Sequence, residues 1–285
     1  MGKQSSLFDN SSQNIPEKAK REIERLVKDL THHCYLYHVL DSPEIPDAEY
    51  DKLYRRLKEL EEEFNYILPD SPTQRVGAPP LEKFIKVKHT EPMLSLGNAF
   101  SHDEVREFEK RIKKFLKSDD PITYTVEPKY DGFAIELSYI KGILEKASTR
   151  GDGYVGEDVT QNIRTINAVP LKIEGVNVPD EIDIRGEIYM NIKDFEKLNR
   201  ERKRSNEPAF ANPRNAAAGS VRQLDPSVMA KRKFHLACYG LGALKGKSFK
   251  SHWEFIEWLK EAQFPTPLNI ELKDNIEGVI NVIKE

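Results

Sequence analysis

Apolar residues near the N-terminus recur at the spacing of amphipathic helices. The i, i+3, i+4, i+7 spacing predicts one helix with a single buried stripe, formed by Ile23, Leu26, Val27, Leu30, Cys34 and Tyr37. Pro43 and Pro46 interrupt this pattern because proline lacks a backbone N–H. We expect Asp47 to cap a second helix, whose apolar face consists of Tyr50, Leu53, Leu57, Leu60 and Phe64.

The pattern changes twice after this helical hairpin. Residues 69–100 contain five prolines and two glycines, which predicts a connecting loop with short ordered pieces. Helical spacing then returns at Val105, Phe108, Ile112, Phe115 and Leu116.

Alternation with a period of two begins after Pro121. It predicts strands at 122–126 and 133–139, with a hairpin turn at Lys141-Gly142 leading into a third strand from Ile143. Further strands are expected at 182–190 and 234–239, and further helices at 192–204 and 252–262. This mixture predicts an α+β fold, with a helical hairpin subdomain followed by a domain of antiparallel sheets flanked by helices. The expected organisation is a disordered tail at 1–14, a helical subdomain at 15–80 and the sheet-containing domain at 81–285.

Composition narrows the class of protein. The chain has 285 residues, 38% of them hydrophobic and 32% charged, which is typical of a globular protein. No apolar run is long enough for a membrane span, and no signal peptide pattern is present, so we expect a cytoplasmic protein without a membrane partner. The two cysteines form neither a zinc pattern nor a disulfide framework. A net charge of −3 argues against a wholly basic surface, although residues 200–204 form either a local basic patch or an ordinary solvated helix end.

The string Glu127-Pro128-Lys129-Tyr130-Asp131-Gly132 is the first candidate for chemistry. Lys129 lies between two predicted strands, where the backbone would place it accurately, and glycine lets a chain pass close to a ligand. A lysine amine becomes a nucleophile once burial or nearby cations favour loss of its proton. The alternative is an ordinary Asp-Gly turn with an exposed lysine.

Three later stretches carry residues suited to phosphate or ribose binding. Arg150 lies in a glycine-bearing turn that closes the hairpin, so it is expected near Lys129, unless the turn is an ordinary exposed one. Glu187 interrupts an apolar strand, where it faces a ligand, a metal or a cation, or else solvent together with Asp183 and Arg185. Residues 210–220 combine small residues and an Asn-Pro turn with arginine side chains, and they also fit a tightly packed helix start.

Together these stretches resemble the covalent nucleotidyltransferases, and specifically the NAD+-dependent DNA ligases of bacteria. The lysine motif alone would also fit ATP-dependent ligases and capping enzymes. The resemblance to the NAD+-dependent family rests on the N-terminal hairpin, at 35–38 and 47–51, and on 70–77, 92–96 and 210–220. It extends from about residue 17 to about residue 245.

The resemblance implies roles for individual residues. Lys129 would attack the α-phosphorus of NAD+ and become joined to AMP, releasing nicotinamide mononucleotide (NMN). Glu127 would contact the adenine, Tyr239 would stack on it, and Arg150 and Glu187 would contact the ribose and help organise the reaction. The remaining NAD+ contacts would come from Tyr37, His38, Asp47, Tyr50, Asp51, Ser95 and Leu96. Arg214 and Arg222 would bind phosphates of the cofactor or of nicked DNA.

The resemblance also implies partners and limits. Mg2+ is expected from the family and the chemistry, although no metal site follows from ligand spacing. Nicked duplex DNA is the expected partner in replication and repair, and the chain is expected to be a monomer. The chain ends at Glu285, before the family's further catalytic lysines, so we expect an adenylation portion that does not seal nicks alone. Residues 277–284 echo one of the lysine motifs but fit a helix better. The alternatives are a non-catalytic NAD+- or DNA-binding remnant and an ATP-dependent nucleotidyltransferase.

Overall fold

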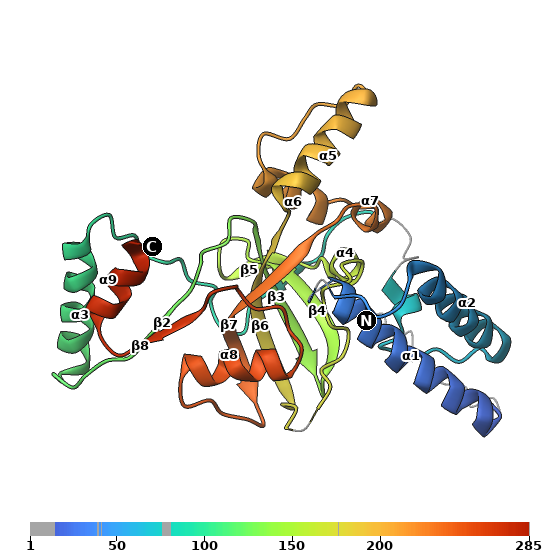
Figure 1. Ribbon diagram of the computed structural model, residues 1–285, viewed down its shortest axis with the longest axis horizontal. Coiled ribbons are helices and arrows are strands. Elements are labelled where there is room, and N and C mark those ends of the chain that lie inside the picture. Colours follow the sequence, from blue (N-terminus) through green and yellow to red (C-terminus); the bar gives the residue numbers. More distant parts are fainter. Residues whose placement is uncertain (1–14, 39, 41, 76–80, 176, 285) are drawn as a thin grey trace, which may run out of the picture. The chain divides into compact units, whose positions relative to one another are not determined.

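The computed structural model describes residues 15–38, 40, 42–75, 81–175 and 177–284 (Figure 1). The chain divides into two compact units, Met1–Gly77 and Ala78–Glu285. The tail expected at 1–14 lies outside the described residues. Within those residues, no helix is both long and apolar enough to cross a membrane.

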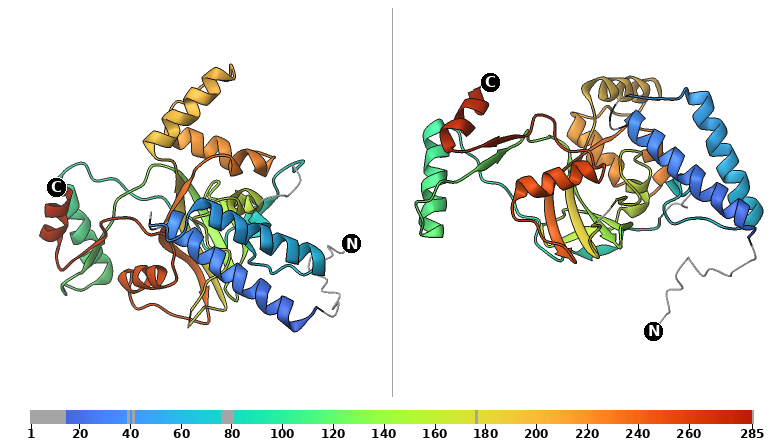
Figure 2. Two further views of the ribbon diagram at one scale, coloured as in Figure 1. Left: turned by 45° about the vertical axis from the view of Figure 1, so that its right-hand side comes forward. Right: turned by 60° about the horizontal axis from the view of Figure 1, so that its bottom comes forward.

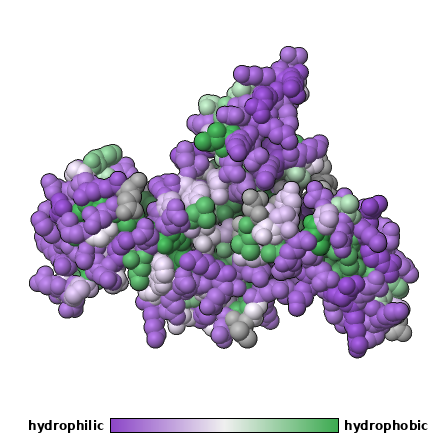
Figure 3. All heavy atoms as spheres, in the orientation of Figure 1, coloured by the Kyte–Doolittle hydropathy of each residue, from purple (hydrophilic) through white to green (hydrophobic). Residues whose placement is uncertain are grey.

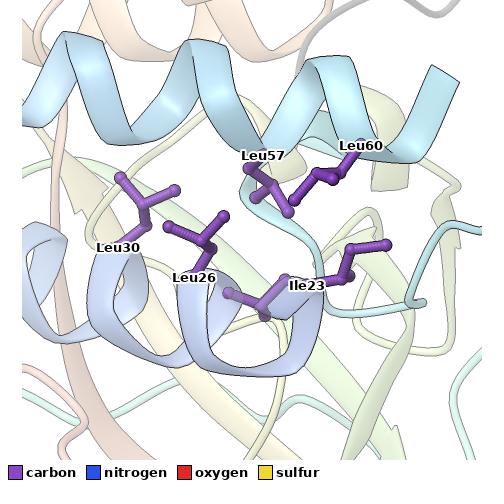
Figure 4. Packing of buried hydrophobic residues seen from close by; sticks show 6 residues of the cluster. Ile23, Leu26, Leu30, Leu57 and Leu60 are labelled. Carbon is purple, nitrogen blue, oxygen red and sulfur yellow. The ribbon is translucent and has the colours of Figure 1, made fainter. Parts of the chain in front are cut away.

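The helical unit consists of α1 (Glu17–His38), α2 (Asp47–Phe64) and the short 3-10 helix η1 (Pro72–Arg75). The two predicted helices are confirmed. Their apolar stripes face each other in a core of aliphatic side chains (Figure 4), which contains Ile23, Leu26, Val27, Leu30, Leu57 and Leu60. Burial of such side chains is the main contribution to the stability of a helical hairpin.

Two predictions about this unit are wrong in detail. Tyr37 does not continue the buried stripe, because its side chain is 43% exposed. Asp47 is not the N-cap of α2. Pro46 takes that position in an extended conformation, and Asp47 is the first helical residue, where its carboxylate interacts favourably with the helix dipole.

The second unit is built around a four-stranded antiparallel sheet in the order β4-β3-β6-β7 (Figure 1). Its strands are β3 (Phe133–Ile140), β4 (Ile143–Thr149), β6 (Glu181–Tyr189) and β7 (His235–Lys245). The hairpin predicted at Lys141-Gly142 is confirmed, because Ile140 pairs with Ile143 across it. β7 extends six residues beyond the predicted end at Tyr239. The α+β fold class is therefore confirmed.

The two faces of this sheet differ in polarity, because successive side chains of a strand point to opposite faces. One face carries the apolar side chains of Leu137, Tyr139 and Ile184, and the Tyr139 ring packs edge-on against Phe264, beyond α8 (His252–Glu261). The other face carries Glu136 of β3 and alternate residues of β6, namely Asp183, Arg185, Glu187 and Tyr189. The polar face contains the candidate site.

Short elements border the sheet. β1 (Lys86–Lys88), one of the ordered pieces expected within 69–100, pairs with β5 (Val155–Glu157). The helices α4 (Thr160–Arg164) and α7 (Pro226–Ala230) were not predicted, whereas α6 (Pro213–Val221) agrees with the interpretation of 210–220 as a helix start. The predicted helix at 192–204 is confirmed as α5 (Ile192–Arg204), which has no buried residue and shows a hydrophilic surface in the view of Figure 3.

The strand expected at 122–126 has a partner that is remote in sequence. It is present as β2 (Tyr124–Val126) and pairs with β8 (Glu271–Lys273) in a separate two-stranded sheet. The helices α3 (His102–Leu116) and α9 (Ile276–Lys284) accompany this pair (Figure 2). Both helices agree with their predicted positions, but α3 has no buried residue, and Phe115 is 86% exposed.

Candidate active site

A pocket of about 280 Å³ lies on the helical unit. It is lined by His33, Cys34, Tyr37, Pro43, Glu44, Ile45, Asp47, Tyr50 and Asp51. The Tyr50 hydroxyl lies 3.0 Å from the Cys34 thiol at this pocket. Burial raises the pKa of Tyr50, with a further contribution from Cys34, so the hydroxyl keeps its proton and remains a hydrogen-bond donor.

Four of the predicted NAD+ residues line this pocket, namely Tyr37, Asp47, Tyr50 and Asp51. The side chain of His38 lies outside the described part of the chain. The prediction missed His33, although it stands one helical turn before Tyr37 and therefore on the same face. Its Nδ1 is buried and has no hydrogen-bond partner among the described residues, so it is available to a polar ligand.

Lys129 lies in the segment 127–132 that joins β2 to β3, and its side chain is exposed. This segment passes very close to β6 at Gly132. A Cβ atom at that position would lie 2.3 Å from the Ile188 carbonyl oxygen and 2.9 Å from Glu187 Cγ. Glycine is therefore required here by close approach, and the Gly132 N–H donates to the Glu187 carboxylate.

Glu187 is mostly buried on the polar face of β6 beside this segment. Burial raises the pKa of Glu187, while the positive charge of Lys129, the Gly132 N–H and, to a smaller extent, Arg214 oppose the rise. Glu187 is thus partly buried and experiences the positive charge of Lys129, which fits the interpretation that it faces a cation. A carboxylate with a raised pKa binds a proton more readily than an exposed glutamate does.

Tyr239 lies where the pairing of β6 with β7 shifts by one residue. Gly186 pairs with Cys238 and Arg185 pairs with Gly240, so Tyr239 is the extra residue of the bulge. Burial raises the pKa of Tyr239 to about 12, with Glu187 adding to the rise and Arg185 and Arg150 opposing it. The bulge thus brings a phenol ring near Glu187 and Arg150.

Arg150 follows the last residue of β4, and its backbone N–H donates to the Ala134 carbonyl oxygen at 3.3 Å. Its guanidinium donates to the Met93 carbonyl oxygen at 3.2 Å and to Ser95 Oγ at 2.7 Å. Two predicted site residues, Arg150 and Ser95, are thus in direct contact. Leu96 projects outward and is 77% exposed.

Glu127 has a partner that the sequence did not indicate. Its Oε1 lies 2.6 Å from Nε2 of His252, the first residue of α8. Ser251 caps this helix by accepting a hydrogen bond from the Glu254 N–H. His252 therefore fixes the direction of the Glu127 carboxylate.

The two predicted phosphate-binding arginines have different surroundings. Arg214 lies in the first turn of α6, which Asn212 caps, and its guanidinium is 3.7 Å from the Asp131 carboxylate. Arg222 donates to Glu157 at 2.9 Å and lines a groove with Phe84 and Gly219. Arg214 thus belongs with the Lys129 segment, whereas Arg222 is paired with strand β5.

Residues beneath the site form a buried polar network that the sequence interpretation did not include. Arg185 Nε donates to Glu136 Oε2 at 3.0 Å, and Arg185 Nη2 donates to the Glu91 carbonyl oxygen at 2.7 Å. His89 contacts the other carboxylate oxygen of Glu136, at 2.7 Å. The only sequence signal was the presence of charged residues at alternate positions of otherwise apolar strands.

Comparison with known proteins agrees with this architecture. The fold is that of an adenylation, or nucleotidyltransferase, domain preceded by a helical domain. Residues 81–285 match the family model of the NAD-dependent DNA ligase adenylation domain, and residues 16–77 match that of the DNA ligase-like, N-terminal NAD+-binding domain.

Several curated relatives are similar over almost the whole chain. The DNA ligase of Thermodesulfovibrio yellowstonii is 64% identical over 272 residues, which cover 95% of this chain and 41% of the relative. Those of Syntrophobacter fumaroxidans and Coprothermobacter proteolyticus are 50% and 48% identical over 94% of this chain, and cover 41% and 40% of the relatives. The chain therefore belongs to the NAD-dependent DNA ligase family, and it spans about two fifths of the length of these relatives.

Proposed function

We propose that this chain performs the first step of NAD+-dependent DNA ligation, the transfer of AMP from NAD+ to Lys129. The observation that supports it most is the position of Lys129, whose charge acts on the mostly buried carboxylate of Glu187. Arg214 and Tyr239 interact electrostatically with the same carboxylate, and Arg150 interacts with Tyr239. A nucleophile, a carboxylate, an aromatic ring and two guanidinium groups suit an adenylate.

In the proposed reaction, Lys129 Nζ attacks the α-phosphorus of NAD+. The new N–P bond forms as the P–O bond to NMN breaks, and NMN leaves with the electron pair of that bond. The amine loses its proton in the process. Glu187, with its raised pKa, is the group of this site best suited to accept that proton, and its charge attracts Lys129.

The other residues bind and orient the dinucleotide. Tyr239 stacks on the adenine, and Glu127, held by His252, accepts a hydrogen bond from it. Arg150 and Ser95, which contact each other, bind the ribose side, with Leu96 at the outer rim. Arg214 neutralises phosphate charge beside Asp131.

The helical unit is proposed to bind the NMN half of NAD+. Its pocket provides carboxylates at Asp47 and Asp51 and aromatic rings at Tyr37 and Tyr50, with His38 beside them in the sequence. Carboxylates and aromatic rings both suit the positively charged nicotinamide ring.

Mg2+ is the metal ion that the family implies. Among the described residues, no group of three His, Cys, Asp or Glu side chains could hold a metal ion. Mg2+ is commonly bound mainly by substrate phosphates and water, so it would be held by the phosphates of the bound NAD+ and not by a dedicated set of side chains. When bound there, the ion would supply positive charge to the phosphate oxygens.

The later steps of DNA ligation are proposed for ligases that contain such an adenylation portion. The AMP on Lys129 would be passed to the 5′-phosphate of a nick in duplex DNA before sealing, in replication and repair. Arg222, which lies in a groove with Phe84, is proposed to contact DNA phosphates. We propose that the chain acts as a monomer in the cytoplasm.

The proposal is tested by supplying alternative AMP donors. The protein is incubated with Mg2+ and either NAD+ or ATP, and the release of NMN or pyrophosphate is measured together with protein-bound AMP. NAD+ should give one NMN per AMP bound, and ATP should give no labelled protein. Labelling from ATP alone, or NAD+ binding without NMN release, would contradict the proposal.

The matched control is Lys129→Ala. Because Lys129 is exposed, this variant should fold normally and bind NAD+, yet release no NMN. The same change at Lys141, in the turn between β3 and β4, should leave NMN release unchanged.

A further inference from the structure

His89 lies just after β1, and its side chain is completely buried. Both ring nitrogens lie close to oxygen atoms. Nδ1 is 2.7 Å from Oε1 of Glu136, and Nε2 is 3.1 Å from the carbonyl oxygen of Arg150. The ring therefore bridges strand β3 and the turn that follows β4.

The chemistry of these two oxygen atoms determines which ring nitrogens carry hydrogen. A carbonyl oxygen can only accept a hydrogen bond, so Nε2 must donate to Arg150. Glu136 accepts a hydrogen bond from Arg185 through its other oxygen, an arrangement that favours the ionised carboxylate. An ionised carboxylate is also an acceptor only, so Nδ1 must donate as well. With Glu136 ionised, the imidazolium form of His89 is the one that satisfies both contacts.

The charged groups around His89 are consistent with a cation at this position. Glu136 of β3 faces it directly, and Arg185 of β6 faces the far side of that carboxylate. Asp152, in the turn after β4, has a lowered pKa, chiefly because of the backbone N–H groups of Val155 and Tyr154, with a smaller contribution from His89. Two further charges lie near this network: Asp183 close to Glu136, and the guanidinium of Arg150.

His89 also begins a segment that crosses the turn containing Arg150. We call residues 89–95 the strap. The His89 N–H donates to the Tyr154 carbonyl oxygen at 2.9 Å, and the Met93 N–H donates to the Gly153 carbonyl oxygen at 2.8 Å. Arg150 returns two hydrogen bonds, to Met93 and Ser95. Within the part of the chain that the structure describes, the His89 ring is the only strap side chain that hydrogen-bonds to the Arg150 backbone.

We propose that His89 is a positioning residue, held as an imidazolium, that fixes the backbone of Arg150 and the strap so that Arg150 and Ser95 are presented to the nucleotide. Its role in AMP transfer rests on the proposed function. The protonation state of His89 and its fixing of the turn do not rest on the proposed function, because they follow from contacts within the protein.

The protonation state is tested by nitrogen NMR of the full chain with labelled histidine. The His89 signals are assigned by their loss in His89→Gln. At a pH where exposed His102 shows the separate signals of a neutral ring, His89 should show two nearly equivalent signals, as in an imidazolium. Separate signals for His89 under those conditions would overturn the protonation claim.

Glu136→Gln distinguishes the effect of the charge on His89 from the effect of its hydrogen bonds. The glutamine oxygen can accept from Arg185 while its NH₂ group donates to Nδ1 of a neutral His89, whose Nε2–H still donates to Arg150. This variant should show the neutral ring by NMR. Its AMP transfer should stay within about threefold of the original protein, which is a small change in barrier.

Loss of the bridge is tested by His89→Gln, with His102→Gln as the matched surface control. Hydrogen exchange should become at least tenfold faster at the amides of Met93 and Gly153 in His89→Gln but not in the control. The KM for NAD+ should rise at least tenfold. Unchanged exchange and unchanged KM in a folded His89→Gln would overturn the positioning role. If the original protein transfers no AMP, the proposed function fails, while NMR and exchange still decide the inference.

Discussion

The helical unit and the sheet unit hold their candidate site residues in contrasting ways. In the helical unit the pocket lies beside a core of buried aliphatic side chains, against which Tyr50 of the pocket packs, and Tyr50 also contacts Cys34. In the sheet unit, charged residues are themselves buried, and Glu136 contacts both Arg185 and His89. Changes in the pocket should therefore affect binding with little cost in stability, whereas loss of a hydrogen-bonding side chain from the network should affect both.

The largest effect on stability is expected from Glu136→Ala. Removing this carboxylate leaves Arg185 and His89 without their shared buried partner, which should reduce the free energy of unfolding by about 3–5 kcal/mol. Both tryptophans, Trp253 and Trp258, lie in α8, so fluorescence during urea unfolding reports on the sheet unit.

Glu181→Ala is the matched control, because Glu181 lies on the neighbouring strand β6 but pairs with Lys245 at the surface. It should unfold at nearly the original urea concentration. Equal effects of the two substitutions would mean that the buried network contributes no more than a surface ion pair.

A large effect confined to the helical unit is expected from Leu57→Ala. Leu57 is fully buried in the aliphatic core, and the cavity should cost that unit about 2–5 kcal/mol. Helix loss by circular dichroism should begin at lower urea, while the tryptophan transition stays in place. A matching shift of the tryptophan transition would contradict an effect confined to the helical unit.

Glu187→Gln should separate activity from stability. The pKa of Glu187 is raised in the folded protein. Between the usual glutamate pKa and this raised pKa, the folded protein therefore binds more protons than the unfolded chain does. The free energy of unfolding consequently falls as the pH rises through this range. At neutral pH, Glu187→Gln should therefore unfold at slightly higher urea. AMP transfer should fall about a hundredfold. Reduced stability at neutral pH would contradict the assigned direction of the pKa shift.

The smallest effect is expected from Tyr50→Phe. The ring keeps its packing, and only the contact with Cys34 and any hydrogen bond to a ligand are lost, which corresponds to about 0.5–1.5 kcal/mol. NMN binding, measured by titration calorimetry, should weaken by up to about tenfold. Tyr66→Phe, which lies against the core outside the pocket, should bind NMN as the original protein does.

The difference between the helical unit and the sheet unit also explains how much of each could be predicted from the sequence. The helical hairpin follows from local periodicity, because residues three and four apart share a face. The pocket wall at Pro43–Ile45 was interpreted only as a helix break, since its second role depends on how α1 and α2 pack. Local patterns also predicted most strands of the central sheet.

Long-range pairings could not be predicted from local patterns. Glu136 alternates with apolar neighbours as in any amphipathic strand, and its partners lie 47 residues earlier, at His89, and 49 residues later, at Arg185. The pairing of β2 with β8 likewise joins two segments that are remote in sequence. The positions of Lys129, Arg150, Glu187 and Tyr239 were anticipated through resemblance to a family, and their roles remain predictions.

The most direct test of the central claim is to map the AMP adduct. The protein is incubated with NAD+ and Mg2+, digested under conditions that preserve the phosphoramide, and its peptides are measured by mass spectrometry. The account predicts a single AMP increment on the peptide containing Lys129, located at that residue. An increment on another residue, or one that persists in Lys129→Ala, would contradict it.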